Sequence, residues 1–291
     1  MNPIFAKIRV FIVGLCLGIL SLTYSTEVLN YMYDSTIPLT KVSLFSDSTY
    51  VIYDNSTANF KMLDDYISTN TMINIPSDYA TISKAIDFLK DKTISPEAKV
   101  TIKLSDNTYT LNSPIELNLR SGNQVEIIGN VTTPSNVRLE CMEQCFSIES
   151  SSIGLIKGMH FVSLGGSFSA INVSNNSLAL IEDIRIDDFY IGISSSSNSH
   201  VTAFRVVADN ISFNTMRVEK LAFIRVVDST LTNNNDGLRA IRAGQARVES
   251  SSITSNTGNP ISVSNQSFVI SSSNTYDGSP NSNMNSLIFI W

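Results

Sequence analysis

The sequence is short of the residues that most often bind metals or act as nucleophiles. Its 291 residues include only 2 histidines and 3 cysteines, and the histidines, His160 and His200, are far apart in sequence. A structural zinc site needs four such ligands, usually in closely spaced pairs, so we expect no metal site and no cofactor. No motif holds a Ser or Asp beside either histidine, which leaves a catalytic histidine without support.

Charged residues are also few, at 16% of the chain, and the formal net charge is −6. No cluster of Lys and Arg with interleaved aromatic residues occurs, so we expect no nucleic-acid partner. Hydrophobic residues make up 43% of the chain, which indicates a folded protein. Ser, Asn and Thr crowd the second half, as in residues 194–199, and such residues favour tight turns.

The uncharged run over residues 10–22 is shorter than the roughly 20 apolar residues of a membrane-spanning helix. Lys7 and Arg9 precede it, and residues 23–25 offer a small-x-small cleavage site. Residues 1–25 are therefore predicted to be a secretory signal. The alternative is an uncleaved membrane anchor over residues 4–22. We expect a secreted or cell-surface protein that contacts a membrane only through this segment.

Loss of a cleaved signal would remove Cys16 and leave Cys141 and Cys145. An even cysteine count fits an oxidising compartment, in which these two would form a small-loop disulfide. The alternative is two buried free thiols, because the spacing alone does not fix the Cβ geometry.

An apolar-x-apolar-x-polar pattern returns every 20 to 25 residues from Ile153 onward. Turn-forming residues separate the copies, and no apolar stripe at helical spacing follows Leu89. Short strands without helices between them exclude βαβ units and indicate coils stacked about 4.8 Å apart. The predicted fold class is all-β, a right-handed parallel β-helix. The aligned copies are Ile153, Leu155, Lys157; Leu178, Leu180, Glu182; Val201, Ala203, Arg205; Leu221, Phe223, Arg225; Ala246, Val248, Ser250; and Phe268, Ile270, Ser272.

An amphipathic helix is predicted near Tyr79 to Leu89, with Ser77 or Asp78 as its N-cap. It would be an N-terminal capping helix that covers the open sheet edges of the first coil. Residues 26–71 precede it as an N-terminal extension, residues 72–278 form the β-helix, and residues 279–291 are a C-terminal tail or cap. The apolar end of this tail packs on the last coil or, alternatively, contacts another subunit.

Three segments, residues 73–86, 100–109 and 125–130, resemble the opening of pectin-lyase-like β-helix proteins, in which a strand, a helix and an isoleucine-x-glycine strand begin the first coil. They are most similar to β-helix proteins associated with phage tails and to uncharacterised bacterial relatives. The resemblance covers residues 73–136 by motif and the remainder by repeat pattern. Asp106-Asn107 replaces the family's usual Asp-Gly, which Asn tolerates because it accepts left-handed backbone angles. The resemblance implies a polysaccharide ligand and a homotrimer.

The motifs of the pectin-degrading enzymes are missing. Asp187-Asp188 precedes Asn234-Asn235-Asp236, against the polygalacturonase order, and neither Gly-His-Gly nor Arg-x-Lys follows. The motifs of pectin methylesterases and pectate lyases are absent as well. Another glycosidase would need only two carboxylates, about 5 to 5.5 Å apart for retention or about 6.5 to 9.5 Å apart for inversion. Six aspartates are predicted on turns of consecutive coils, as catalytic candidates or as ordinary turn residues: Asp183, Asp187, Asp188, Asp209, Asp228 and Asp236.

The alignment also places Lys157, Glu182, Arg205 and Arg225 in one column. Glu182 would then lie between Lys157 and Arg205, and Arg205 would lie over Arg225. Such a strip would bind an acidic glycan or form a surface ladder of ion pairs.

Three functions fit the sequence. The first is a glycan-binding or adhesive surface protein, in which Tyr190, Tyr276 and Phe189 stack on sugars. The second is a polysaccharide depolymerase of the tailspike type, and the third is a structural spacer. The secretory signal favours the first, because phage tail proteins assemble in the cytoplasm.

Overall fold

The computed structural model describes residues 39–43, 50–54, 59–62, 66–283 and 285–290. The chain divides into two compact units, residues 1–64 and 65–291. In the first unit, the strands β1 (Leu39–Ser43), β2 (Tyr50–Asp54) and β3 (Asn59–Met62) form an antiparallel sheet with β2 in the middle. The predicted signal or anchor lies outside the described residues.

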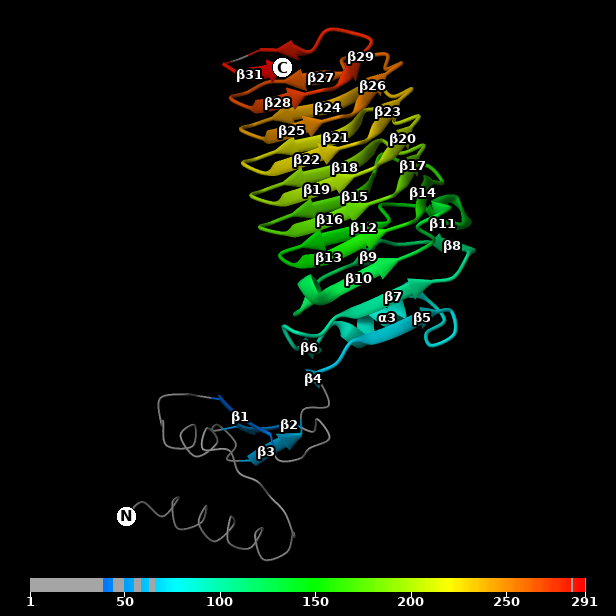
Figure 1. Cartoon of the computed structure of the whole chain (residues 1–291), viewed down its shortest axis with the longest axis vertical. Helices are drawn as coiled ribbons and strands as arrows, with labels where there is room; N and C mark the ends of the chain where they lie inside the picture. Colours follow the sequence, from blue (N-terminus) through cyan, green and yellow to red (C-terminus); the bar gives the residue numbers. More distant parts are fainter. Residues whose placement is uncertain (1–38, 44–49, 55–58, 63–65, 284, 291) are drawn as a thin grey trace, which may run out of the picture. The chain divides into compact units, whose positions relative to one another are not determined.

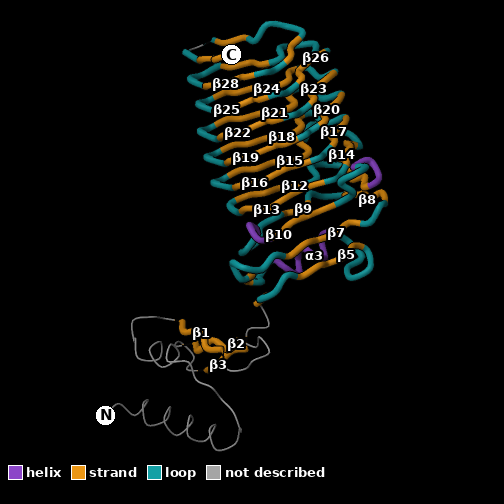
Figure 2. The backbone as a smooth tube through the Cα atoms, in the orientation of Figure 1, coloured by secondary structure: helices purple, strands orange, loops and turns teal. Residues whose placement is uncertain are grey.

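The second unit is an all-β parallel β-helix, which confirms the predicted fold class (Figures 1 and 2). From β7 onward, successive strands join three parallel sheets in turn, so that each coil adds one strand to each sheet. We call these sheets I, II and III.

Sheet I has ten strands. Its strands are β5 (Thr71–Ile75), β7 (Val100–Leu104), β10 (Val125–Ile128), β13 (Ser152–Lys157), β16 (Leu178–Glu182), β19 (His200–Phe204), β22 (Phe223–Val227), β25 (Gln245–Glu249), β28 (Phe268–Ser272) and β31 (Leu287–Ile290).

Sheets II and III have eight strands each. Sheet II consists of β8 (Asn107–Leu111), β11 (Val137–Cys141), β14 (His160–Ser163), β17 (Arg185–Asp187), β20 (Val207–Asp209), β23 (Thr230–Thr232), β26 (Ser252–Thr254) and β29 (Thr275–Tyr276). Sheet III consists of β9 (Ile115–Glu116), β12 (Phe146–Glu149), β15 (Ser169–Ser174), β18 (Ile191–Ser196), β21 (Asn214–Glu219), β24 (Asp236–Ile241), β27 (Ile261–Val263) and β30 (Asn281–Ser282).

The core fills the space between the three sheets with columns of apolar side chains. Alternate residues of each strand point inward, and paired strands place the inward residues of neighbouring coils over one another. One column in sheet I is fully buried through seven coils. Burial of each such side chain contributes about 1.5–3 kcal/mol, less for alanine. The column is Ile102, Ile127, Ile156, Ile181, Ala203, Val226 and Val248.

The alignment drawn from sequence assigned the wrong face to several residues of sheet I. The alignment set Leu178 on the inward face, but Leu178 is 48% exposed, and the inward residues of β16 are Ala179 and Ile181. Leu221, which the alignment set in a strand, is 64% exposed and lies in the turn before β22. Leucines also occupy outward positions in this sheet, so period-two alternation did not distinguish its faces. A slip of one residue turns every side chain to the opposite face.

The helix α3 (Ile82–Leu89) follows β5 and buries its apolar face in the core. Its N-cap is Thr81, whose hydroxyl accepts a hydrogen bond from the Lys84 amide at 3.3 Å, so the predicted caps Ser77 and Asp78 are wrong. A role as a cap stays a prediction. Along the described residues, no helix is long and apolar enough to cross a membrane.

The remaining elements are short. The strands β4 (Tyr66–Ile67) and β6 (Thr93–Ile94) pair in parallel, and η1 (Gly122–Gln124) and η2 (Pro134–Asn136) are 3-10 helices. In the predicted tail, β31 continues sheet I as its last strand beside β28. Ile288 packs on the core, whereas Leu287, Phe289 and Ile290 remain exposed.

From β13 to β25, each coil leaves sheet I through a residue with left-handed backbone angles. In successive coils this residue is Gly158, Asp183, Arg205, Asp228 and Ser250, with φ between 49° and 71°. The turn therefore holds charged side chains beside one another on the outside of the solenoid.

Candidate functional site

The outer faces of the three sheets are where a ligand would meet the protein, because the interior is closed by core side chains. These faces differ in chemistry. Sheet I carries an ion network over apolar side chains, sheet II carries the candidate aspartates Asp187 and Asp209, and sheet III carries arginine side chains with aromatic rings at its border.

The predicted ladder exists in part on sheet I. Lys157 and Glu182 are paired across β13 and β16, with Nζ 2.9 Å from the carboxylate, as predicted. Arg205 also reaches Glu182, at 3.3 Å, but from the turn, where its closer partner is Asp183 at 2.5 Å. Asp183 contacts Lys157 as well, at 3.2 Å. Hydrogen bonds from Arg205 and Lys157 outweigh burial and hold the pKa of Asp183 below its ordinary value.

The predicted position of Arg225 is wrong. The strand partner of Glu182 is Phe204, and Arg225 pairs with Thr202 and Arg247 in a neighbouring column. Arg205 and Arg225 therefore do not stack. Arg205 leaves the column because the coil from β16 to β19 has 22 residues rather than the 23 of the alignment, and Arg225 leaves it because the coil from β19 to β22 has 23 rather than 20.

On sheet I, Glu249 compensates the charges of Arg225 and Arg247. Its two carboxylate oxygens lie 2.7 Å and 2.5 Å from the two guanidinium groups. Burial raises the pKa of Glu249, but hydrogen bonds from Arg225 and Arg247 outweigh burial and lower it overall. The Arg225 guanidinium carbon also lies 5.7 Å from the centroid of the Phe204 ring.

The aspartates divide between turns and strands. Asp183, Asp188 and Asp228 lie on turns with positive φ, as predicted. The prediction is wrong for the others, because Asp187 and Asp209 end strands and Asp236 begins one. Asp236 is buried, at 8% exposed, accepts a hydrogen bond from the Asn259 amide and lies 3.2 Å from the Asn214 side-chain amide.

The outer face of sheet II holds a contact that the sequence did not predict. Asp187 accepts hydrogen bonds from His160 at 2.8 Å and from Arg185 at 2.7 Å. Burial raises the pKa of Asp187, but the His160 and Arg185 hydrogen bonds outweigh it, so the pKa lies below its ordinary value. The strand register would have shown this contact, since Arg185 pairs with His160 and Asp187 lies two residues further along β17.

Asp187 and Asp209 are strand partners on adjacent coils, which gives two neighbouring carboxylates. Asp209 accepts a hydrogen bond from Asn233 at 2.9 Å, and Asp188 accepts one from Asn210 at 2.6 Å. A general acid of a glycosidase needs a raised pKa. The lowered pKa of Asp187 and its two bonded partners are typical of a structural ion cluster.

Sheet III offers an aromatic surface at its border with sheet II. The rings of Tyr190 and Phe213 are stacked, with centroids 4.8 Å apart and planes 13° apart. The Arg239 guanidinium carbon lies 5.3 Å from the Phe213 centroid. Of the other predicted stacking residues, Phe189 is fully buried and Tyr276 packs against the core.

Arg217 lies beside Arg239 as its strand partner, with Ser194 and Ser262 as the next residues in the same column. Arg217 forms an ion pair with Glu219 at 3.0 Å, and Glu219 also contacts Arg242 at 3.4 Å. We call Tyr190, Phe213, Arg217 and Arg239 the sheet III site. Sequence reasoning missed three of its four residues, because none of those three belongs to a motif.

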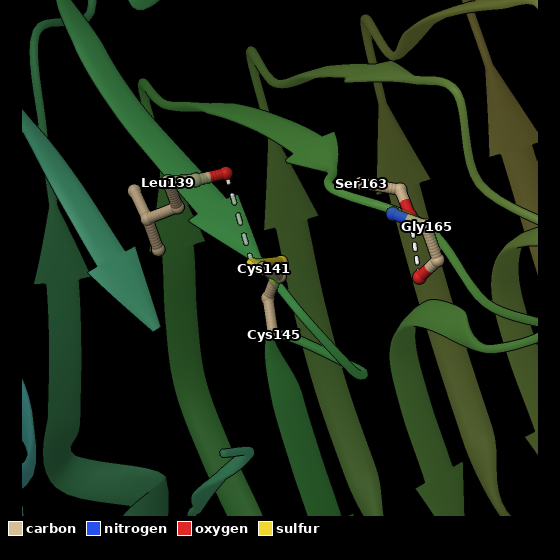
Figure 3. The surroundings of a disulfide bond; sticks show 5 residues. All are labelled: Leu139, Cys141, Cys145, Ser163 and Gly165. Carbon is tan, nitrogen blue, oxygen red and sulfur yellow. Dashed lines mark hydrogen bonds between the residues drawn. A yellow bond between two sulfur atoms is a disulfide. The ribbon is translucent and has the colours of Figure 1, made fainter. Parts of the chain in front are cut away.

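Cys141 and Cys145 form a disulfide at the end of β11, with Cα atoms 5.5 Å apart (Figure 3). Both residues are fully buried. Within the described residues, no group of three or more His, Cys, Asp or Glu is placed to hold a metal ion.

Comparison with known families and with curated proteins finds no match. Among solved structures, the chain is similar to ORF18 of Geobacillus virus E2, at 12% identity and a TM-score of 0.34. The match covers 91% of this chain and 59% of that protein, so the chain spans about three fifths of its length. A likeness this low carries no functional argument. The resemblance to pectin-lyase-like and phage-tail proteins stays a prediction.

Proposed function

We propose that this β-helix binds extracellular or cell-surface polysaccharide on the outer face of sheet III. The stacked pair Tyr190 and Phe213 carries the proposal, because the exposed parts of the two rings offer an apolar surface to the C–H groups of a sugar. Arg239 and the serines of the same sheet supply hydrogen-bond donors for hydroxyl groups beside the rings.

Export to the cell exterior is part of the proposal. The disulfide between Cys141 and Cys145 supports it, since disulfides persist in oxidising compartments. The pattern of residues 1–25 supports it independently.

The proposal is tested by binding to a panel of acidic and neutral polysaccharides, using protein exported from its host through its own N-terminal segment. Phe213→Ala is expected to weaken binding by about tenfold, equivalent to about 1.4 kcal/mol. Phe204→Ala is the matched control, because Phe204 is a partly exposed phenylalanine below an arginine on sheet I. Equal effects of the two variants would contradict the sheet III location.

The alternatives are separated in the same samples. Release of reducing ends that disappears in Asp187→Asn or Asp188→Asn would identify a depolymerase. Neither binding nor release across the panel would favour the structural spacer.

A further inference from the structure

The sheet III site contains two arginines that the fold forces together. Arg217 and Arg239 are strand partners on consecutive coils, so their backbones lie about 4.8 Å apart and their side chains leave the same face. Like charges directly opposite one another in a sheet are destabilising. The pair therefore needs a negative charge nearby.

The protein supplies too little negative charge at this point. Glu219 is the carboxylate that contacts Arg217, and it is shared with Arg242. Within the described residues, no carboxylate lies within 4.0 Å of the Arg239 guanidinium. Arg217 and Arg242 thus share one glutamate, and Arg239 has no carboxylate partner among the described residues.

Partial burial makes this shortage costly. The Arg217 side chain is 24% exposed, and the Nε atoms of Arg217 and Arg239 are buried without a hydrogen-bond partner. A partly desolvated guanidinium without a counter-ion is unfavourable. The exposed part of the Arg217 side chain remains available to a ligand.

On sheet I, the repulsion between two neighbouring arginines is offset by a glutamate of the chain. Arg225 and Arg247 are also strand partners, and Glu249 contacts both. On sheet III the glutamate, Glu219, lies on the first strand of the pair, and its Oε2 atom contacts both Arg217 and the turn residue Arg242. An external anion would fill on sheet III the role that Glu249 fills on sheet I.

We propose that Arg217 and Arg239 together bind an anionic group of the ligand, a carboxylate or a sulfate or phosphate ester, which bridges the two guanidinium groups. The inference rests on the proposed function and narrows it to acidic polysaccharides, with the sugar that bears the anionic group lying beside the Phe213 ring.

The test uses sulfate as the probe. The unfolding temperature of the full chain is measured in sodium sulfate and in sodium chloride at equal ionic strength. Sulfate stabilises proteins in general. The quantity compared between variants is therefore the sulfate gain, the increase in unfolding temperature from chloride to sulfate. Arg239→Gln is expected to unfold at a higher temperature than wild type in chloride, because the repulsion is removed, and to gain less from sulfate. Arg217→Gln is a second variant with the same expected loss of gain.

Arg247→Gln is the matched control on sheet I. It is expected to keep the full sulfate gain, because Glu249 already compensates Arg225. Equal sulfate gains in wild type, Arg239→Gln and Arg217→Gln would overturn the inference.

A second measurement separates the inference from the proposed function. A polysaccharide that binds wild type is compared with its carboxyl-reduced or desulfated form, and wild type is expected to prefer the acidic form by at least about tenfold. Arg239→Gln is expected to lose this preference. Binding of both forms with equal affinity would refute the anion site and leave the proposed function intact. A sulfate gain specific to wild type without binding of any polysaccharide would refute the proposed function and leave the anion site.

Discussion

Two pairs of stacked arginines lie on different faces of this solenoid and have different surroundings. Arg225 and Arg247 on sheet I share Glu249, whereas on sheet III Arg217 shares Glu219 with Arg242, and Arg239 contacts no carboxylate among the described residues. Each pair contains one Arg-x-Glu strand and one Arg-x-apolar strand, so the local sequences are alike. The pairs differ in which strand carries the glutamate, the second strand (β25) on sheet I and the first strand (β21) on sheet III, and Glu219 also contacts Arg242.

This comparison shows that a parallel β-helix can place like-charged residues of consecutive coils directly beside one another. In-register pairing brings equivalent residues of consecutive coils together, and a counter-charge must come from a nearby position or from a ligand. Sheet I is compensated within the chain, and sheet III is open to an external anion.

The largest expected effect comes from making sheet I resemble sheet III. Glu249→Gln removes the carboxylate shared by Arg225 and Arg247 and is expected to lower the free energy of unfolding by about 1–2 kcal/mol, a modest value because both arginines are partly exposed. Urea denaturation measures the change. The variant should also acquire an additional stabilisation by sulfate. If it does not, the two arginine pairs do not differ through their counter-charge.

The pH dependence of stability gives the next effect. The folded-state pKa of Glu249 is below its ordinary value of 4.5, so its contribution is complete above the unfolded pKa and is lost as pH falls through the folded pKa. The difference in unfolding free energy between wild type and Glu249→Gln should therefore shrink as pH falls below about 4.5. The difference between wild type and Arg239→Gln, measured in chloride, should change less over this range.

Adding a carboxylate beside the arginines of sheet III should change the free energy of unfolding by a smaller amount and in the opposite direction. Ser262 is the strand partner of Arg239 on the next coil, and Ser262→Glu places a carboxylate beside it. We expect stabilisation by about 0.5–1 kcal/mol and loss of the sulfate gain. Ser262→Gln is the control for side-chain size. An unchanged sulfate gain in Ser262→Glu would show that the anion binds elsewhere.

The smallest change in stability is expected when Arg242 is replaced. Arg242→Ser frees Glu219 to approach Arg239, and Arg242 is 59% exposed, so stability should change by less than about 0.5 kcal/mol. The preference for an acidic polysaccharide should nevertheless fall. Retention of the full preference would mean that Arg242 does not control the charge of the site.

The sequence predicted the fold because the repeat is strong from Ile153 onward. It did not predict the register of sheet I, since outward residues such as Leu178 and Leu180 are as apolar as the inward ones. Coil lengths also vary, so Glu182 pairs with Phe204 rather than with Arg205. One insertion or deletion in a turn shifts every later column.

The candidate site was predictable only in part. Lys157 and Glu182 were placed correctly because the register was right at that step. The pairing of Arg217 with Arg239 depends on a register of sheet III, and the sequence pattern had been aligned for sheet I alone. The shared use of Glu219 depends on side-chain directions at the turn, which no sequence spacing specifies.

The nearly constant coil length from β16 to β28 has a consequence for how this molecule can change. Paired positions such as Leu178, His200, Phe223 and Gln245 are separated by 22 or 23 residues. Removal or duplication of one coil places strands of the same sheet next to one another, so these strands can still pair in register. The length of the solenoid can therefore vary in steps of one coil, about 4.8 Å each, while the chemistry of each face is kept. The number of coils and the side chains on the outer faces of the solenoid can therefore change independently of one another.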